Sequence, residues 1–128
     1  MDGYFRDLIV WQKTMELAKA VYAVTKDFPA DERYALTDQL RRTVVSIPSN
    51  IAEGNGRASS ADYGHFLSIA RGLLYETITQ LELAKELGYV GGDSRSRSTL
   101  DEIYSLAEEI SRMLTTMLKK YGALQKEI

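Results

Sequence analysis

Residues 36–54 read LTDQLRRTVVSIPSNIAEG, and this stretch decides the fold because a helical pattern of apolar residues runs across a proline. Its aliphatic residues recur at steps of four, four, three and four, at Leu36, Leu40, Val44, Ile47 and Ile51. That spacing places them on one face of a helix with 3.6 residues per turn. Pro48 lacks the N–H that would bond to the Val44 carbonyl, so a helix that continues through it should bend. The competing interpretation is that the helix ends at Pro48.

The first part of the chain, residues 7–28, predicts another helix with two apolar seams. One seam follows Leu8, Trp11, Met15, Ala18, Tyr22 and Thr25, and the other follows Val10, Leu17, Val21, Val24 and Phe28. Together they make an apolar face wider than contact with one neighbouring helix needs. The surplus apolar surface is therefore a candidate for contact with another molecule.

Two more apolar patterns predict helices over residues 60–88 and 99–121. The inward positions expected for the first are Phe66, Ala70, Leu73, Thr77, Leu81 and Ala84. Those expected for the second are Leu100, Ile103, Ala107, Ile110, Leu114, Met117 and Tyr121. Ser59 with Asp62 reads as a capping box, Gly88 as a helix stop, and Thr99 with Glu102 as a second capping box. Residues 91–98, GGDSRSRS, are expected to form a surface loop.

These segments, with a helix over 32–54, make four amphipathic helices joined by short connections. We therefore expect one domain over residues 1–128, an all-α, antiparallel, up-down-up-down four-helix bundle. The formal net charge is −2, which provides no global positive field for nucleic acid. Neither a membrane span nor a secretory signal is visible, so a soluble, cytoplasmic protein is the expectation.

The sequence offers little for catalysis or metal binding. The chain has no cysteine and a single histidine, His65, which pairs with Asp62 in the only Asp-x-x-His arrangement. A di-metal carboxylate centre in a bundle needs two Glu-x-x-His pairs and two more inward glutamates, and only Asp62 with His65 resembles such a pair. No nucleophile elbow or phosphate-binding loop is present. We expect no enzyme activity, no metal and no cofactor.

Polar residues in the stretch 36–54 give a candidate binding site. Arg41 and Arg42 are adjacent, and with Arg57 and Arg71 they form a candidate arginine patch for nucleic acid. The alternative is that Arg41 and Arg42 pair with Asp38, and Arg57 with Glu53. A second candidate is a polar notch or interface at the proline; its expected residues are Ser46, Pro48, Ser49, Asn50 and Glu53, with Tyr75, Glu76 and Gln80 across the bundle or at a subunit interface.

Three strings carry a resemblance to a known family: FRDLIVWQKTMELAKAVYAVTKDFP at 5–29, ERYALTDQLRRTVVSIPSNIAEGNGR at 32–57 and FLSIARGLLYETITQLELAKELGY at 66–89. The chain resembles the four-helix bundle family encoded in intervening sequences of bacterial 23S ribosomal RNA genes. The resemblance implies a bacterial homo-oligomer, typically a pentamer, a second helix that continues through Pro48, and no known enzymatic activity. The gene location suggests RNA contact. A protein-binding scaffold without any nucleic-acid role is the alternative, and the mild acidity of the chain favours it.

Overall fold

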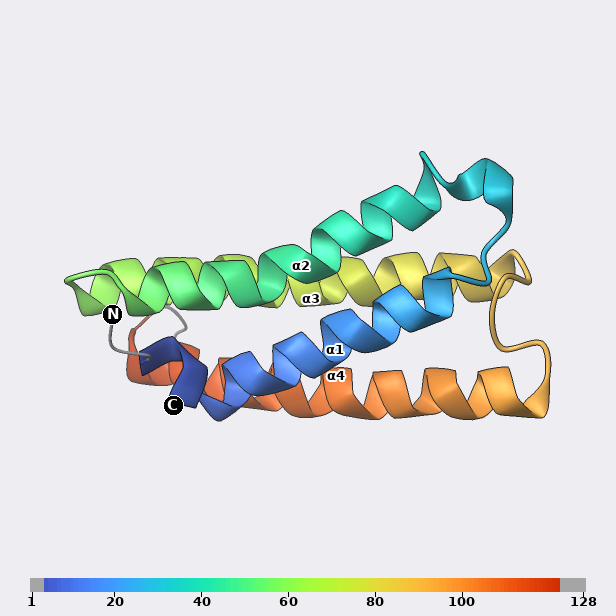
Figure 1. Cartoon of the computed structure of the whole chain (residues 1–128). Coiled ribbons are helices and arrows are strands. Elements are labelled where there is room, and N and C mark those ends of the chain that lie inside the picture. Colours follow the sequence, from blue (N-terminus) through green and yellow to red (C-terminus); the bar gives the residue numbers. More distant parts are fainter. Residues whose placement is uncertain (1–3, 123–128) are drawn as a thin grey trace.

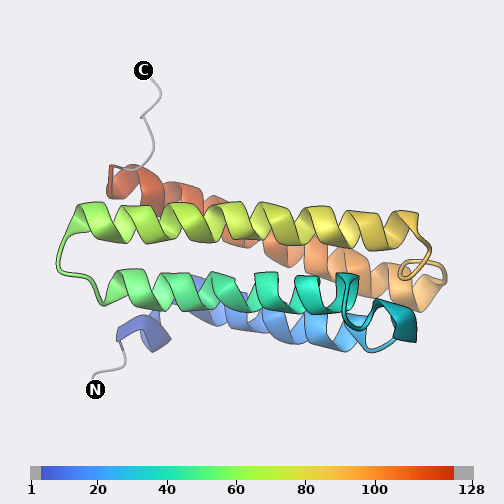
Figure 2. The ribbon, with the colours of Figure 1, turned by 90° about the horizontal axis from the view of Figure 1, so that it is seen from above.

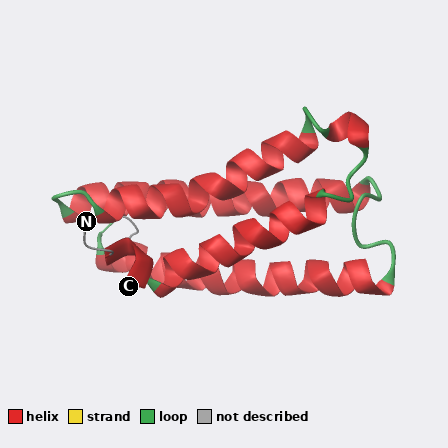
Figure 3. Cartoon of the chain, in the orientation of Figure 1, coloured by secondary structure: helices red, strands yellow, loops and turns green. Residues whose placement is uncertain are grey.

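The computed structural model describes residues 4–122, and within them every regular element is helical (Figures 1 and 3). The four long helices are α1 (Ile9–Thr25), α2 (Leu36–Asn55), α3 (Ser60–Glu86) and α4 (Ser94–Lys120). Two short 3-10 helices, η1 (Tyr4–Asp7) and η2 (Ala30–Glu32), precede α1 and α2.

The helices form an antiparallel four-helix bundle in which the chain reverses direction at each connection (Figures 1 and 2). Each long helix contacts two others, in the closed order α1–α2–α3–α4–α1, and η1 packs against both α1 and α2. Helices α1 and α3 therefore lie on opposite corners of the bundle. The predicted fold class is confirmed.

Helix α2 continues through Pro48, as the apolar pattern and the resemblance predicted. It changes direction along its length, so that its first half diverges from α3 while its second half runs alongside it (Figure 1). Side chains around the proline bond to carbonyls one turn back: Ser49 Oγ donates to Val45 O at 3.0 Å, and Asn50 Nδ2 donates to Ser46 O at 2.8 Å. Such bonds to the helix's own carbonyls accompany bending. The alternative, that the helix ends at the proline, is wrong.

The core is built from the apolar faces of all four helices. On α2 the predicted residues Leu40, Val44, Ile47 and Ile51 are fully buried, while Leu36 is half-buried. On α1 the seam through Leu17 and Val21 forms the core. Much of the other seam remains at the surface, because Met15 and Tyr22 are exposed and Trp11 is half-buried.

Several predicted helix ends differ from the structure. The first helix spans 9–25 rather than 7–28, and the second begins at Leu36 rather than at 32. Residues 30–32 form η2 instead, and the Glu32 carboxylate accepts hydrogen bonds from the Leu36 N–H at 3.3 Å and the Tyr89 hydroxyl at 2.7 Å. The hydrogen bond to Glu32 raises the pKa of Tyr89.

The start of the fourth helix was also predicted wrongly. It begins at Ser94, not 99, because the Asp93 side chain accepts a hydrogen bond from the Ser96 N–H at 2.7 Å and caps the helix. Most of the GGDSRSRS segment is therefore helical rather than loop. The start of the third helix was predicted correctly: the Ser59 side chain accepts from the Asp62 N–H.

The helix stop at Gly88 is confirmed in detail, although α3 itself ends at Glu86. Gly88 has a φ of 81°, and its N–H donates to Lys85 O, while the Tyr89 N–H donates to Ala84 O. This pair of bonds is a Schellman motif, which favours glycine at the left-handed position.

Candidate interaction surface

An apolar groove of about 640 Å³ runs between α1 and α2 on the outside of the bundle. Its α1 side is made by the surface seam, including Trp11, Met15 and Tyr22, and its α2 side by Val45, Pro48 and Ala52. The remaining lining residues are Phe5 from η1, Ala18, Lys19, Ala23, Lys26 and Ser49. We call this feature the α1–α2 groove.

Local sequence explains why the groove exists. Alanines at 18, 23 and 52 leave space where larger side chains would fill the gap between the helices. Pro48 lines the groove while being itself buried, so the bent part of α2 forms one wall. Among residues 4–122, the charged lining residues are Lys19 and Lys26, and no acidic side chain of this range lines the groove. The groove is therefore apolar with a basic α1 side.

Arg41, predicted for the arginine patch, ties α2 to α1. Its Nε donates to Thr25 Oγ1 at 2.8 Å, its Nη2 donates to Tyr22 O at 3.5 Å, and its guanidinium lies 4.8 Å from the centre of the Tyr22 ring. The alternative of an Arg41–Asp38 pair is not what forms. Thr25 is buried at the end of α1, so Arg41 satisfies a polar group there and its side chain is committed to the bundle.

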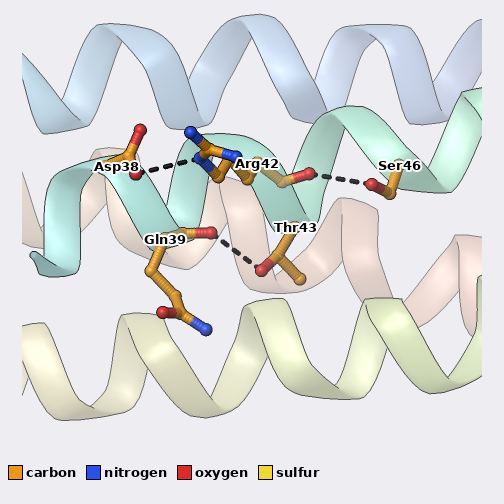
Figure 4. A network of polar contacts seen from close by, with 5 residues as sticks. All are labelled: Asp38, Gln39, Arg42, Thr43 and Ser46. Atoms are coloured by element: carbon orange, nitrogen blue, oxygen red, sulfur yellow. Dashed lines mark hydrogen bonds and ion pairs between the residues drawn. The ribbon is translucent and has the colours of Figure 1, made fainter.

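Arg42 and Arg57 each pair with the carboxylate one turn back. Arg42 Nε lies 2.9 Å from Asp38 Oδ2, and Arg57 Nη2 lies 3.1 Å from Glu53 Oε1. Both arginines are exposed, and Figure 4 shows Arg42 beside Asp38 on α2. The Arg57 guanidinium also lies 4.8 Å from the centre of the Phe66 ring. Exposed ion pairs of this kind contribute about 0–1 kcal/mol, so either arginine can exchange its carboxylate for another anion at little cost.

Arg71 lies on α3 and contacts a side chain that turns towards α4. Its guanidinium stacks on the Tyr75 ring at 5.1 Å, and the Tyr75 hydroxyl lies 3.1 Å from Ser111 Oγ on α4. Arg41 in contrast contacts α1, whereas Arg42 on α2 and Arg57 just beyond its end are exposed to solvent. The four arginines of the predicted patch therefore make different contacts: Arg41 with α1, Arg42 and Arg57 with carboxylates one turn back, and Arg71 with Tyr75.

The polar notch at the proline is closed by bonds within α2. Ser46 Oγ donates to Arg42 O at 3.0 Å (Figure 4), and Ser49 and Asn50 bond to carbonyls as described above. Glu53 is paired with Arg57. These groups are already hydrogen-bonded, so the notch offers a partner little unsatisfied polarity.

The predicted partners on α3 do not join that stripe. Tyr75 turns to α4, Glu76 is exposed and makes no ion pair with a described residue, and Gln80 is buried with its Oε1 lacking a partner among residues 4–122. A hydrogen-bonded network across the bundle is therefore absent from the described structure.

Nothing in the described range assembles into a metal site. No group of three His, Cys, Asp or Glu side chains there is close enough to hold an ion. His65 is exposed and packs edge-on against Phe66. None of the described helices has the length and apolarity needed to cross a membrane.

The sequence predicts the apolar surplus on the first helix and an interface at Pro48 and Ser49, both of which line the groove, but it does not point to Val45 or Ala52. Val45 was not singled out, because a lone valine opposite the core face looks like ordinary surface variation. The signal is the seam through Trp11, Met15 and Tyr22, which forms a groove only because side chains of α2 lie beside it.

Comparison with known proteins agrees with the fold. No curated protein matches the chain. The sequence pattern of the family described as 23S rRNA-intervening sequence protein matches residues 6–116. This range contains nearly all of the groove lining and most of the four helices. The chain therefore belongs to the 23S rRNA-intervening sequence protein family.

Proposed function

We propose that the protein is a non-catalytic bundle in the bacterial cytoplasm that assembles with further copies of itself, and that the α1–α2 groove is one of its contact surfaces. The observation that carries this proposal is the exposure of Met15, Tyr22 and Val45 at 39, 41 and 41% around one groove. A monomer would leave this apolar surface in water, whereas contiguous exposed apolar patches of this kind mark interaction sites. A closed ring, five copies by resemblance, is the expected assembly.

Val45→Asp tests the proposal. A carboxylate in the apolar groove would have to be buried on association, so we expect the variant to remain folded but to fall towards the mass of the 14.4 kDa chain. Light scattering after size exclusion measures this mass. The fold should survive because Val45 is exposed in the single chain.

Thr116→Asp is the matched control, since it places a carboxylate on the exposed side of α4, away from the groove. This variant should keep the wild-type mass. If Val45→Asp assembles at the same concentration as the wild type, the groove is not a contact surface. If the wild-type protein is monomeric, the whole proposal is wrong.

A second candidate function is binding of structured RNA by the assembled protein. The favouring observation is that the Arg42 side chain is 80% exposed and that Arg57, just beyond the end of the same helix, is exposed as well, each paired with its carboxylate only at the surface. Repetition of two such arginines around a ring would raise the avidity for phosphates. Arg41 and Arg71, committed to the bundle, would contribute less.

Titration against structured ribosomal RNA fragments at several salt concentrations tests this candidate. We expect Arg42→Glu with Arg57→Glu to weaken binding and to lower the salt slope by about two for each copy that contacts the RNA, because each arginine neutralises one phosphate. The matched control is Arg112→Glu, which breaks an equivalent pair with Glu108 on α4. Binding that is absent at low salt, or unchanged by the double substitution, would contradict the RNA role and leave assembly as the function.

A further inference from the structure

Helix α3 carries a second exposed apolar surface, on a different side of the bundle from the groove. Ile69, Glu76, Leu83 and Leu87 follow one another at steps of seven, seven and four, which places them along one side of the helix. Leu83 and Leu87 are 48 and 50% exposed, and Ile69 is exposed as well. We call these four residues, with Glu86 beside them, the α3 strip.

The charges of the strip and the groove are complementary. The described residues that line the groove include Lys19 and Lys26 and no acid, whereas the charged residues of the strip are Glu76 and Glu86. None of these four side chains forms an ion pair with a described residue, although four other ion pairs do form on the surface. The groove and the strip are therefore both apolar and carry unpaired charges of opposite sign, which makes the two surfaces electrostatically complementary.

The dimensions of the two surfaces also agree. The strip from Ile69 to Leu87 spans 18 helical steps, or about 27 Å, at 1.5 Å per residue. The α1 side of the groove from Trp11 to Lys26 spans 15 steps, or about 22 Å. A helix laid in the groove could therefore contact most of its length, as in helix-in-groove recognition.

We infer that the α3 strip of one copy docks in the α1–α2 groove of the next, with Glu76 and Glu86 facing Lys19 and Lys26. This inference rests on the proposed self-assembly. It names the α3 strip as the surface of one copy that contacts the groove of the next. Groove and strip lie on different helices, so each copy would offer one surface to each of two neighbours. Such a head-to-tail interface builds a closed ring when the rotation between copies closes, and a filament when it does not.

Charge reversal tests the pairing. Lys19→Glu with Lys26→Glu makes the groove acidic, and Glu76→Lys with Glu86→Lys makes the strip basic. Either double variant sets like charges against each other, so we expect the concentration for half-assembly to rise at least tenfold. The chain with all four substitutions restores opposite charges at every contact and should assemble near the wild-type concentration. Light scattering across a dilution series measures each value, and circular dichroism checks that each variant is folded.

Lys119→Glu with Lys120→Glu is the control, because it changes the net charge by the same amount as the groove variant at exposed positions of α4 outside both surfaces. It should assemble like the wild type. If the wild type assembles but the double variants do so equally well, or the fourfold variant fails to recover, the pairing of strip and groove is wrong while self-assembly stands. A wild type that remains monomeric overturns both.

Discussion

Gly54→Ala is expected to lower the free energy of unfolding by about 1–3 kcal/mol, the usual cost of overpacking a well-packed site. A Cβ added at Gly54 would lie 2.6 Å from the Phe66 Cβ and 3.1 Å from the Tyr63 ring. The first of these atoms is attached directly to the α3 backbone, so the two helices must move apart to accept the methyl group. Alanine's better helix propensity, about 1 kcal/mol, offsets only part of this cost.

The same substitution at Gly72 should change the free energy of unfolding in the opposite direction. Gly72 is exposed within α3, and a Cβ there meets no atom within 4 Å. Gly72→Ala should therefore raise the free energy of unfolding by up to about 1 kcal/mol. Urea denaturation of both variants measures the difference. Equal stabilisation by the two alanines would show that α2 and α3 are not in close contact at Gly54.

The contrast between Gly54 and Gly72 also shows that the sequence alone does not identify which glycine lies at a close contact between helices. Gly54 was expected to mark the end of a helix, and it does lie in the last turn of α2, but it is also the site of a close contact with α3. For Gly72, inside a predicted helix, the sequence leaves both a close helix contact and mere tolerance of glycine open, and the structure places it in open space. Periodicity alone cannot separate these cases, because the identity of the residue opposite a glycine depends on how two helices are aligned. Phe66, twelve residues further on, is the neighbour that decides the role of Gly54.

The helical faces were more predictable than the helix ends. The residues Leu40, Val44, Ile47 and Ile51 are all buried as expected, because burial of an apolar stripe is the dominant favourable term in packing a helix. The start of α4 was missed because two capping signals compete there. Asp93 caps the helix at its actual start, while Thr99, expected as the cap, donates to Arg95 O inside the helix.

The candidate site was only partly predictable for a related reason. Sequence spacing identifies partners one helical turn away, and the Arg42–Asp38 and Arg57–Glu53 pairs were found in this way. The partner of Arg41 is Thr25, sixteen residues earlier on another helix. Contacts between helices depend on their alignment and rotation, which one amphipathic pattern does not fix. The groove was predictable only in part for the same reason: its α1 side follows from the apolar surplus, whereas the α2 side chains beside it depend on how the two helices are aligned.

Gln80→Met is expected to raise the free energy of unfolding by about 1–2 kcal/mol. Gln80 is 9% exposed, and its Oε1 has no hydrogen-bond partner among the described residues. A buried unpaired carbonyl oxygen costs about 1–3 kcal/mol, and methionine replaces the amide with an apolar group of similar length. The helix propensities of the two residues are nearly equal, so the change isolates the burial of the amide.

Gln39→Met provides the comparison. Gln39 lies on α2 (Figure 4), its side chain is exposed, and neither of its amide atoms is both buried and without a hydrogen bond. This change should stay within about 0.5 kcal/mol of the wild type. A loss of stability in Gln80→Met would contradict this prediction and show that the amide is hydrogen-bonded in the folded chain. Urea denaturation of both variants measures the two changes in the free energy of unfolding.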